Sequence, residues 1–211
     1  MKLHLGCGRH YLKGYINIDL PSVSRSPQKN GVADVYKNIL KIRYPANSIE
    51  EIRLHHVFEH FTRPNACALL SAWYIWLKPN GILHIEVPDF YRTATVILNP
   101  FTKNISKARA IRHLYGSHEA LWAVHCEGYT SKSLSFMIRL YGFDIYKTEK
   151  NSWKGTYNFL ILAKKSIHTL NVKELKARTE NYLKLFLVDE SEQKIFNTWM
   201  KSYQKQLKIM I

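Results

Sequence analysis

Acidic residues are scarce in this chain of 211 residues, where 16 Asp and Glu stand against 31 Lys and Arg and leave a formal net charge of +15. A surplus of this sign favours anionic partners such as phosphate groups, nucleic acid or a charged membrane surface. Residues 101–117 concentrate it, because they include Lys103, Lys107, Arg109 and Arg112 and no acid. For most of the lysines, a solvated surface that keeps the protein soluble is the simpler interpretation.

Long apolar runs are also missing, and no stretch approaches the roughly 20 residues that a membrane-spanning helix needs. The first residues lack the apolar core of a signal peptide, so we expect a cytoplasmic location and no membrane span. The three cysteines, Cys7, Cys67 and Cys126, are far apart and form no CxxC pair. This spacing argues against a disulfide framework or a zinc site and fits a reducing compartment.

Short apolar runs rich in β-branched residues make up the first three quarters of the chain. Between two of them, residues 64–77 have helical spacing and end at the breaker Lys78-Pro79-Asn80-Gly81. Strands that alternate with helices predict a mostly parallel sheet with right-handed crossovers. The last two runs are joined by a polar loop and predict a terminal antiparallel hairpin. Strands are expected at residues 2–5, 15–20, 33–36, 51–54, 82–87, 143–148 and 157–163.

The pattern after residue 165 is helical. Residues 171–187 are amphipathic and begin with Asn171 and Glu174 in the spacing of a capping box. A second helix with one apolar stripe is expected after Asp189. We therefore predict an α/β domain at residues 1–165, with a Rossmann-like sheet of about seven strands, and a helical C-terminal extension at residues 166–211. The stripe is typical of packing against the domain or a partner chain, so a homodimer through these helices is an open alternative.

The opening stretch lacks the third glycine of the dinucleotide motif GxGxxG, because Gly6-Cys7-Gly8 is followed by Arg9-His10-Tyr11. Asp19 comes only eleven residues after Gly8, and the residues between leave room for a turn but not for a helix of three turns. Without that helix, the N-terminus that would hold a diphosphate is absent. A phosphate-binding GxxxxGK[ST] loop is absent as well.

S-adenosylmethionine (SAM) carries no phosphate and has different requirements. Two close glycines let the backbone approach its methionine part. An ionised carboxylate at the end of the next strand can accept from both ribose hydroxyls. Gly6, Gly8 and Asp19 meet these requirements, so the opening stretch favours SAM over a dinucleotide.

Four stretches resemble, in order, the motifs of class I SAM-dependent methyltransferases: LHLGCG, YINIDL, LHHVFEHF and WLKPNGILHIEVPDF. The resemblance covers roughly residues 2–163 and is nearest to small predicted methyltransferases associated with surface-polysaccharide biosynthesis. It implies SAM as the cofactor, S-adenosyl-L-homocysteine as its product, and a carbohydrate or a nucleotide- or lipid-linked sugar as the acceptor. The cofactor-binding positions that it implies are Gly6, Cys7, Gly8, Asp19, Leu20, Asn38, His55, His56 and Glu59.

The chain departs from the family pattern at three places. Asn80 replaces the second glycine of KPGG, which is tolerable because asparagine also accepts left-handed turn geometry. Asn38 stands where the family often has an Asp. The helix that precedes the first strand in the family is missing, which suggests either a trimmed fold or a module of a larger glycan-synthesis protein.

Methyl transfer to a hydroxyl needs a base, and histidine is the natural choice near neutral pH. In the family a histidine stands just before the helix that His125 also precedes here, so the resemblance makes His125 the first candidate. His118 is the second. Asp89 follows the last parallel strand, where it either contacts the acceptor or caps the next helix. The histidines and glutamates of residues 118–127 match no familiar ligand spacing, so no metal site is expected.

The sequence therefore predicts a SAM-dependent methyltransferase that O-methylates a sugar hydroxyl of a glycan or glycan precursor with a histidine base. Two alternatives stay open. The positive charge favours an RNA or protein methyltransferase, although no NPPY or DPPY motif and no RNA-binding signature is present. A non-catalytic binding module on a SAM fold is the other, and the intact Gly6, Gly8 and Asp19 disfavour it.

Overall fold

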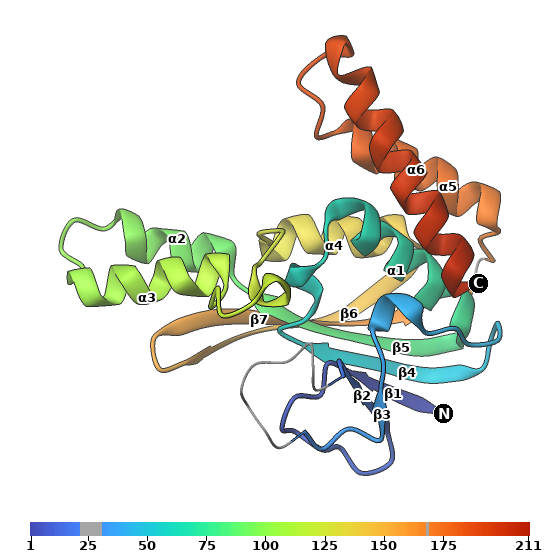
Figure 1. Cartoon of the computed structure of the whole chain (residues 1–211), viewed down its shortest axis with the longest axis horizontal. Helices are drawn as coiled ribbons and strands as arrows, with labels where there is room; N and C mark the ends of the chain where they lie inside the picture. Colours follow the sequence, from blue (N-terminus) through green and yellow to red (C-terminus); the bar gives the residue numbers. More distant parts are fainter. Residues whose placement is uncertain (22–30, 168) are drawn as a thin grey trace.

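The structure is a computed structural model that describes residues 1–21, 31–167 and 169–211. Seven strands form one sheet in the order β3-β2-β1-β4-β5-β7-β6 (Figure 1). Strands β1 to β5 run parallel, and β7 runs antiparallel to both β5 and β6. This confirms the predicted sheet with its terminal hairpin. The strands are β1 (Lys2–Leu5), β2 (Ile16–Asp19), β3 (Val35–Tyr36), β4 (Ile49–His55), β5 (Leu77–Pro88), β6 (Phe143–Trp153) and β7 (Thr156–Lys165).

Four strands are longer than predicted, and β4 exceeds its expected range of 51–54 by two residues at its start and one at its end. β5 begins at Leu77, because Leu77 pairs with Ile49 ahead of an irregularity in register, and it therefore takes in the expected turn at residues 78–81. β6 and β7 continue to Trp153 and Thr156, which pair across the hairpin. The side chains in the second half of β6 are polar and mostly exposed, so they give no apolar alternation from which the length of this strand could be predicted.

The helix predicted before the breaker at residues 78–81 is present. α1 corresponds to the predicted helix at residues 64–77 and is buried along most of its length. The segment between Gly8 and β2 forms turns and no helix, as its length predicted. The α-helices are α1 (Arg63–Trp76), α2 (Phe90–Leu98), α3 (Asn104–Tyr115), α4 (Ser131–Leu140), α5 (Val172–Lys184) and α6 (Gln193–Met210). The short 3-10 helices are η2 (Ile39–Lys41), η3 (Phe58–His60), η4 (Leu121–Ala123) and η5 (Glu190–Glu192).

The two faces of the sheet have different compositions. Leu3, Ile52 and Leu83 are fully buried and belong to the same core cluster as the helices, which lie together on one side of the sheet in Figure 1. Because side chains alternate along a strand, their neighbours point to the opposite face. We call this opposite face the polar face. The side chains on it include Lys2, His4, Asn17, Glu51, Arg53 and His84.

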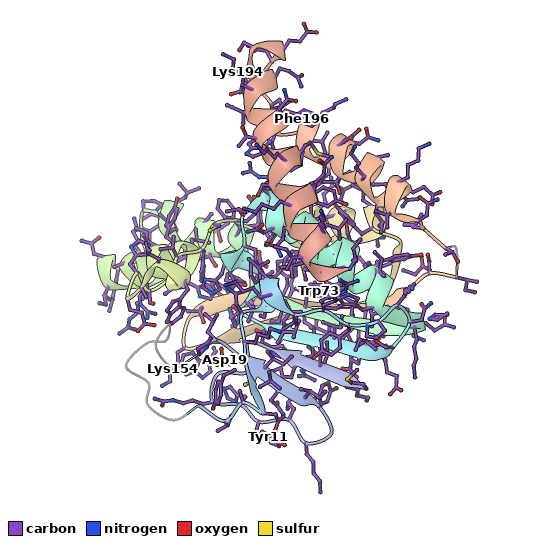
Figure 2. The ribbon with its side chains drawn as sticks, turned by 45° about the vertical axis from the view of Figure 1, so that its right-hand side comes forward. Tyr11, Asp19, Trp73, Lys154, Lys194 and Phe196 are labelled. Carbon is purple, nitrogen blue, oxygen red and sulfur yellow. The ribbon has the colours of Figure 1, made fainter. Side chains whose placement is uncertain are left out.

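The C-terminal helices pack on α1. Asn171 caps α5 and forms the predicted capping box with Glu174. On α6, Tyr203 lies 3.1 Å from the hydroxyl of Ser71, and the carbonyl of Met210 accepts a hydrogen bond from Trp76 Nε1 at 3.0 Å. The other end of α6, with Lys194, extends away from Trp73 (Figure 2), although Phe196 in its first turn still packs against the core cluster. Within the described part of the chain, none of these helices combines the length and the apolar character needed to cross a membrane.

Candidate functional site

The turn after β1 contains two glycines, of which Gly6 is packed closely against Val57 and Gly8 borders open space. Gly6 and Gly8 have φ values of 67° and 55°, in the left-handed region that glycine favours. A Cβ on Gly6 would collide with the side chain of Val57, whereas one on Gly8 would meet nothing within 4 Å. The amides of Gly6 and Cys7 donate to the carbonyl of Ile18 at 2.8 and 3.1 Å, which fixes the turn on β2. The backbone at Gly8 is therefore held in place and open to a ligand.

Asp19 ends β2 beside this turn, at the edge of the sheet where the parallel strands end (Figure 2). Its Oδ2 accepts from the amide of Gly8 at 3.1 Å, and its Oδ1 accepts from the amide of Leu20 at 2.7 Å. Each carboxylate oxygen has further lone pairs. Asp19 is thus oriented by the glycine turn and can still accept from ligand hydroxyls.

Asn38 follows β3 at the same edge. It is the N-cap of η2, and its Oδ1 accepts from the amide of Leu40 at 2.9 Å. This oxygen is therefore engaged in local structure, where the family often has an Asp.

His55, the last residue of β4, faces the polar face. Its Nε2 lies 2.7 Å from Nε2 of His84, and the two rings stack with centroids 4.8 Å apart. Burial lowers the pKa of His55 to about 4, and burial together with the charge of Arg53 lowers the pKa of His84 to about 3. Both rings are neutral at physiological pH, so one donates a hydrogen bond and the other accepts it.

His56 lies between two carboxylates and has a left-handed backbone with φ of 53°. Its Nδ1 is 3.4 Å from Oε1 of Glu59, and its Nε2 is 3.5 Å from Oε1 of Glu86. Burial disfavours the charged ring, but the nearby negative charges of both glutamates outweigh it and raise the pKa of His56 to about 9. His56 is therefore an imidazolium at neutral pH and cannot serve as a base.

Glu59 lies in η3 and is only 1% exposed, and neither of its carboxylate oxygens has a protein hydrogen bond of good geometry. His60 and His125 approach it with ring centroids 4.6 Å apart. Each of these histidines has its Nδ1 next to a backbone carbonyl, of Val124 at 3.1 Å and of Leu114 at 3.2 Å. A carbonyl can only accept, so Nδ1 carries a proton in both rings.

His125 Nε2 is 3.9 Å from Oε1 of Glu59. Burial lowers the pKa of His125, so the ring is neutral at pH 7 with an accepting nitrogen near a buried carboxylate. A proton taken up at this nitrogen would be stabilised by the charge of Glu59.

Glu59, His60 and His125 are also the residues in the described ranges that could hold a metal ion, with ligand atoms within 4.8 Å of one another. Two imidazoles and one carboxylate suit Zn²⁺ or Fe²⁺. The protonated His56, however, already balances the charge of Glu59 at 3.4 Å. The positive charge of His56 therefore disfavours a metal ion bound to Glu59, His60 and His125.

Asp89 follows β5 and caps α2, with Oδ1 accepting from the amide of Arg92 at 3.1 Å. The cap that the sequence left as one of two alternatives is therefore present, and the side chain is 3% exposed. His118 is exposed, and its Nε2 lies 2.9 Å from the carbonyl of Tyr115. No described contact joins His118 to Glu59, so the structure brings His125, but not His118, into this cluster.

Three polar side chains near the site were not among the predicted residues. Glu86 reaches His56, His84 pairs with His55, and His113 lies with its ring centroid 5.8 Å from that of His56. Glu86 and His84 occur at alternate positions of residues 82–87, which are otherwise apolar. That alternation was the signal in the sequence that could have revealed them.

Neither a protein-family model nor a curated protein sequence matches the chain. Solved structures do match. A SAM-dependent methyltransferase from Methanosarcina mazei is 17% identical, covers 79% of this chain and 92% of its own, and has a TM-score of 0.53. A chain from the complex of the Haloferax volcanii Trm112 methyltransferase activator with a methyltransferase is 11% identical over 81% of this chain and 83% of its own, with a TM-score of 0.55.

The 1,6-didemethyltoxoflavin-N1-methyltransferase of Burkholderia thailandensis was solved with 1,6-didemethyltoxoflavin and S-adenosylhomocysteine bound. It is 13% identical, covers 78% of this chain and 70% of its own, and has a TM-score of 0.52. At these identities the similarity concerns the fold. The chain has the fold of class I SAM-dependent methyltransferases.

Proposed function

We propose that this chain is a SAM-dependent methyltransferase. The observation that carries the proposal is the connection between Gly8 and Asp19, in which an open glycine backbone orients a carboxylate that can accept from the ribose. This connection belongs to a fold whose solved neighbours are SAM-dependent methyltransferases. A fold alone does not specify a function, so the proposal depends on this site.

The cofactor would lie along the carboxyl ends of β1, β2 and β4. Gly6, Cys7 and Gly8 would contact its methionine part, while Asp19 and Leu20 would contact the ribose. Further contacts are assigned to Asn38 and to the segment after β4, with His55, His56 and Glu59. When bound, SAM supplies an activated methyl group on a sulfonium.

We assign the base to His125. It would take the hydroxyl proton of the acceptor at Nε2, and the resulting imidazolium would face Glu59. Removal of that proton by His125 would make the acceptor oxygen a better nucleophile for the methyl group that the cofactor would supply. Asp89 and His118 would lie near the acceptor. No step requires a metal.

The acceptor proposed is a sugar hydroxyl of a glycan or of a nucleotide- or lipid-linked precursor. A hydroxyl needs a base, and a neutral histidine of the correct tautomer supports that chemistry. The association with polysaccharide enzymes comes from the sequence resemblance. The Burkholderia thailandensis neighbour is named for methylation at nitrogen, so the fold does not fix the acceptor.

Two measurements test the proposal. Calorimetry with SAM and S-adenosylhomocysteine tests the cofactor site, and absence of binding would contradict an enzyme of this class. Labelled SAM offered with a panel of oligosaccharides, nucleic acids and peptides tests the acceptor. Methylation of RNA or peptide instead of sugar would select the alternative that the net charge of +15 supports. Binding of SAM without methylation of any member would support the binding module.

The base is tested by His125→Ala. We expect turnover to fall at least about tenfold, because a general base contributes roughly 10²–10⁴-fold, while SAM affinity stays near that of the unaltered protein. His118→Ala is the matched control and should retain more activity. A chelator should leave turnover unchanged, because His56 balances the charge of Glu59 without a metal. Unchanged turnover in His125→Ala would remove this residue as the base.

A further inference from the structure

α2 and α3 form a helical hairpin that leaves the sheet at the carboxyl end of β5 (Figure 1). Its base borders the proposed site, because Asp89 caps α2 and His113 near the end of α3 lies 2.9 Å from Oδ1 of Asn158. Its tip is the segment 98–105. With 9 residues in α2 and 12 in α3, the helices reach about 13–18 Å from base to tip.

The tip exposes large apolar side chains. Leu98 is 79% exposed, Phe101 is 94% exposed and Ile105 is 59% exposed. Single exposed apolar residues are ordinary, but several of them gathered within eight residues of a projecting tip indicate a contact surface. Further along α3, Ile111 and Tyr115 are also exposed.

The same hairpin is strongly basic. Residues 90–117 contain no Asp or Glu. Lys103 and Arg109 are exposed, and Lys107 is partly exposed. An apolar tip flanked by cationic side chains is complementary to an anionic bilayer, in which phosphates attract the cations and the acyl boundary accepts the apolar groups. A nucleic acid would use the cations, but the aliphatic side chains of Leu98 and Ile105 cannot stack on bases.

A second exposed element lies at the same edge of the sheet. The turn between β6 and β7 reaches beyond the carboxyl end of β5, toward the side on which the helical hairpin projects (Figure 1). Trp153, the last residue of β6 before this turn, is 67% exposed, and the Lys154 ammonium lies 4.7 Å from its ring centroid. Tryptophan beside lysine is typical of membrane–water interfaces.

We propose that the α2–α3 hairpin docks on the surface of an anionic lipid bilayer. Leu98 and Phe101 enter the acyl boundary, the lysines and arginines of α3 lie among the headgroups, and Trp153 lies at the interface. This docking turns the carboxyl edge of the sheet, with Asp19 and His125, toward the membrane. The inference stands on the surface itself and does not depend on methyl transfer.

The test is co-sedimentation of the full chain with vesicles of phosphatidylcholine, with and without phosphatidylglycerol. We expect binding to the phosphatidylglycerol vesicles that weakens as salt is raised. The double variant Leu98→Ser/Phe101→Ser should bind at least about tenfold more weakly, since each side chain loses its apolar transfer. The matched control is Leu185→Ser/Val188→Ser, which removes apolar side chains that are 65% and 85% exposed beyond α5. The control should bind like the unaltered protein.

Three results would overturn the proposal. The first is that the unaltered protein, shown to be folded by its thermal transition, does not bind the anionic vesicles. The second is that the control variant loses as much binding as the tip variant. The third is that single-stranded RNA displaces the protein from the vesicles, while the tip substitutions leave the binding of the protein to the vesicles unchanged. Calorimetry with SAM is a separate measurement, so failure of docking and failure of the proposed enzyme are distinguishable.

Discussion

The helix-covered face of the sheet and the polar face are built from the same strands but have opposite chemistry. In β5, Leu83 is fully buried under the helices, while its neighbour His84 points to the polar face and pairs with His55. Strands buried on both faces read as nearly continuous apolar runs. Here apolar and polar residues alternate, so the alternation itself indicated a sheet with helices on one side. The helix-covered face holds the apolar core, and the edge next to the polar face holds the candidate site.

The largest expected difference is between adjacent residues of one strand. Leu83→Ala should lower the free energy of unfolding by about 2–5 kcal/mol, because it leaves a cavity in the close-packed face. Ile82→Ala, on the half-buried opposite side, should cost about 1 kcal/mol. Urea unfolding monitored by circular dichroism measures both. Equal losses would break the distinction between the two faces.

The next effect concerns ligand binding alone. Asp19→Ala should weaken SAM binding by about 1–3 kcal/mol, because the ribose hydroxyls lose their acceptor. Asp189→Ala removes a capping carboxylate from η5, among the C-terminal helices, and should leave SAM affinity unchanged. Calorimetry measures both variants. An unaltered affinity in Asp19→Ala would contradict the ribose assignment.

A smaller effect is expected at the capping box of α5. Asn171→Ala removes the acceptor for the amide of Glu174, at 3.0 Å, and should lower the free energy of unfolding by about 1 kcal/mol. The residue is exposed, so no cavity forms. Thermal and urea unfolding measure the loss. A loss as large as that of Leu83→Ala would mean that this helix contributes more than its packing indicates.

The smallest effect at neutral pH should come from His84. Its pKa in the folded chain, about 3, is below the ordinary value of 6.5, so the unfolded chain binds a proton that the folded chain does not. The free energy of unfolding should therefore fall as pH drops from 6.5 toward 4. In His84→Gln the free energy of unfolding should fall less steeply with decreasing pH, by an amount that corresponds to up to about one bound proton per molecule. At pH 7.5 the variant and the unaltered protein should differ little. Urea unfolding across this pH range measures the slope, and parallel slopes would refute the neutral histidine pair.

Much of the fold could be predicted because its signals are local. The strand positions followed from alternation, and α5 followed from the spacing of Asn171 and Glu174. The turn at Gly6 and Gly8 and the nearby Asp19 lie within one short stretch, so their proximity was predictable as well. The predicted cofactor roles of these residues stay predictions.

The rest of the candidate site depends on contacts between distant segments. His60 and His125 meet because the segment after α3 folds back, with a bridge between Gly116 and Val124. The spacing of residues in the sequence does not indicate that this segment folds back. Glu59 could therefore be proposed as a site residue, but its proximity to His125 could not be predicted. Arg63 is a similar case, since it stacks at 4.0 Å on Phe186 of the C-terminal extension.

The hydrogen bond from Trp76 to the carbonyl of Met210 spans 134 positions of the chain. During synthesis, α1 therefore emerges long before the residues that cover it. Trp76 on α1 cannot make this hydrogen bond until the last turn of α6 has left the ribosome. Until then, this side of α1 is accessible to chaperones or to other nascent chains. Closure of this core should accordingly be a late event in folding, because contacts between residues far apart in sequence form slowly.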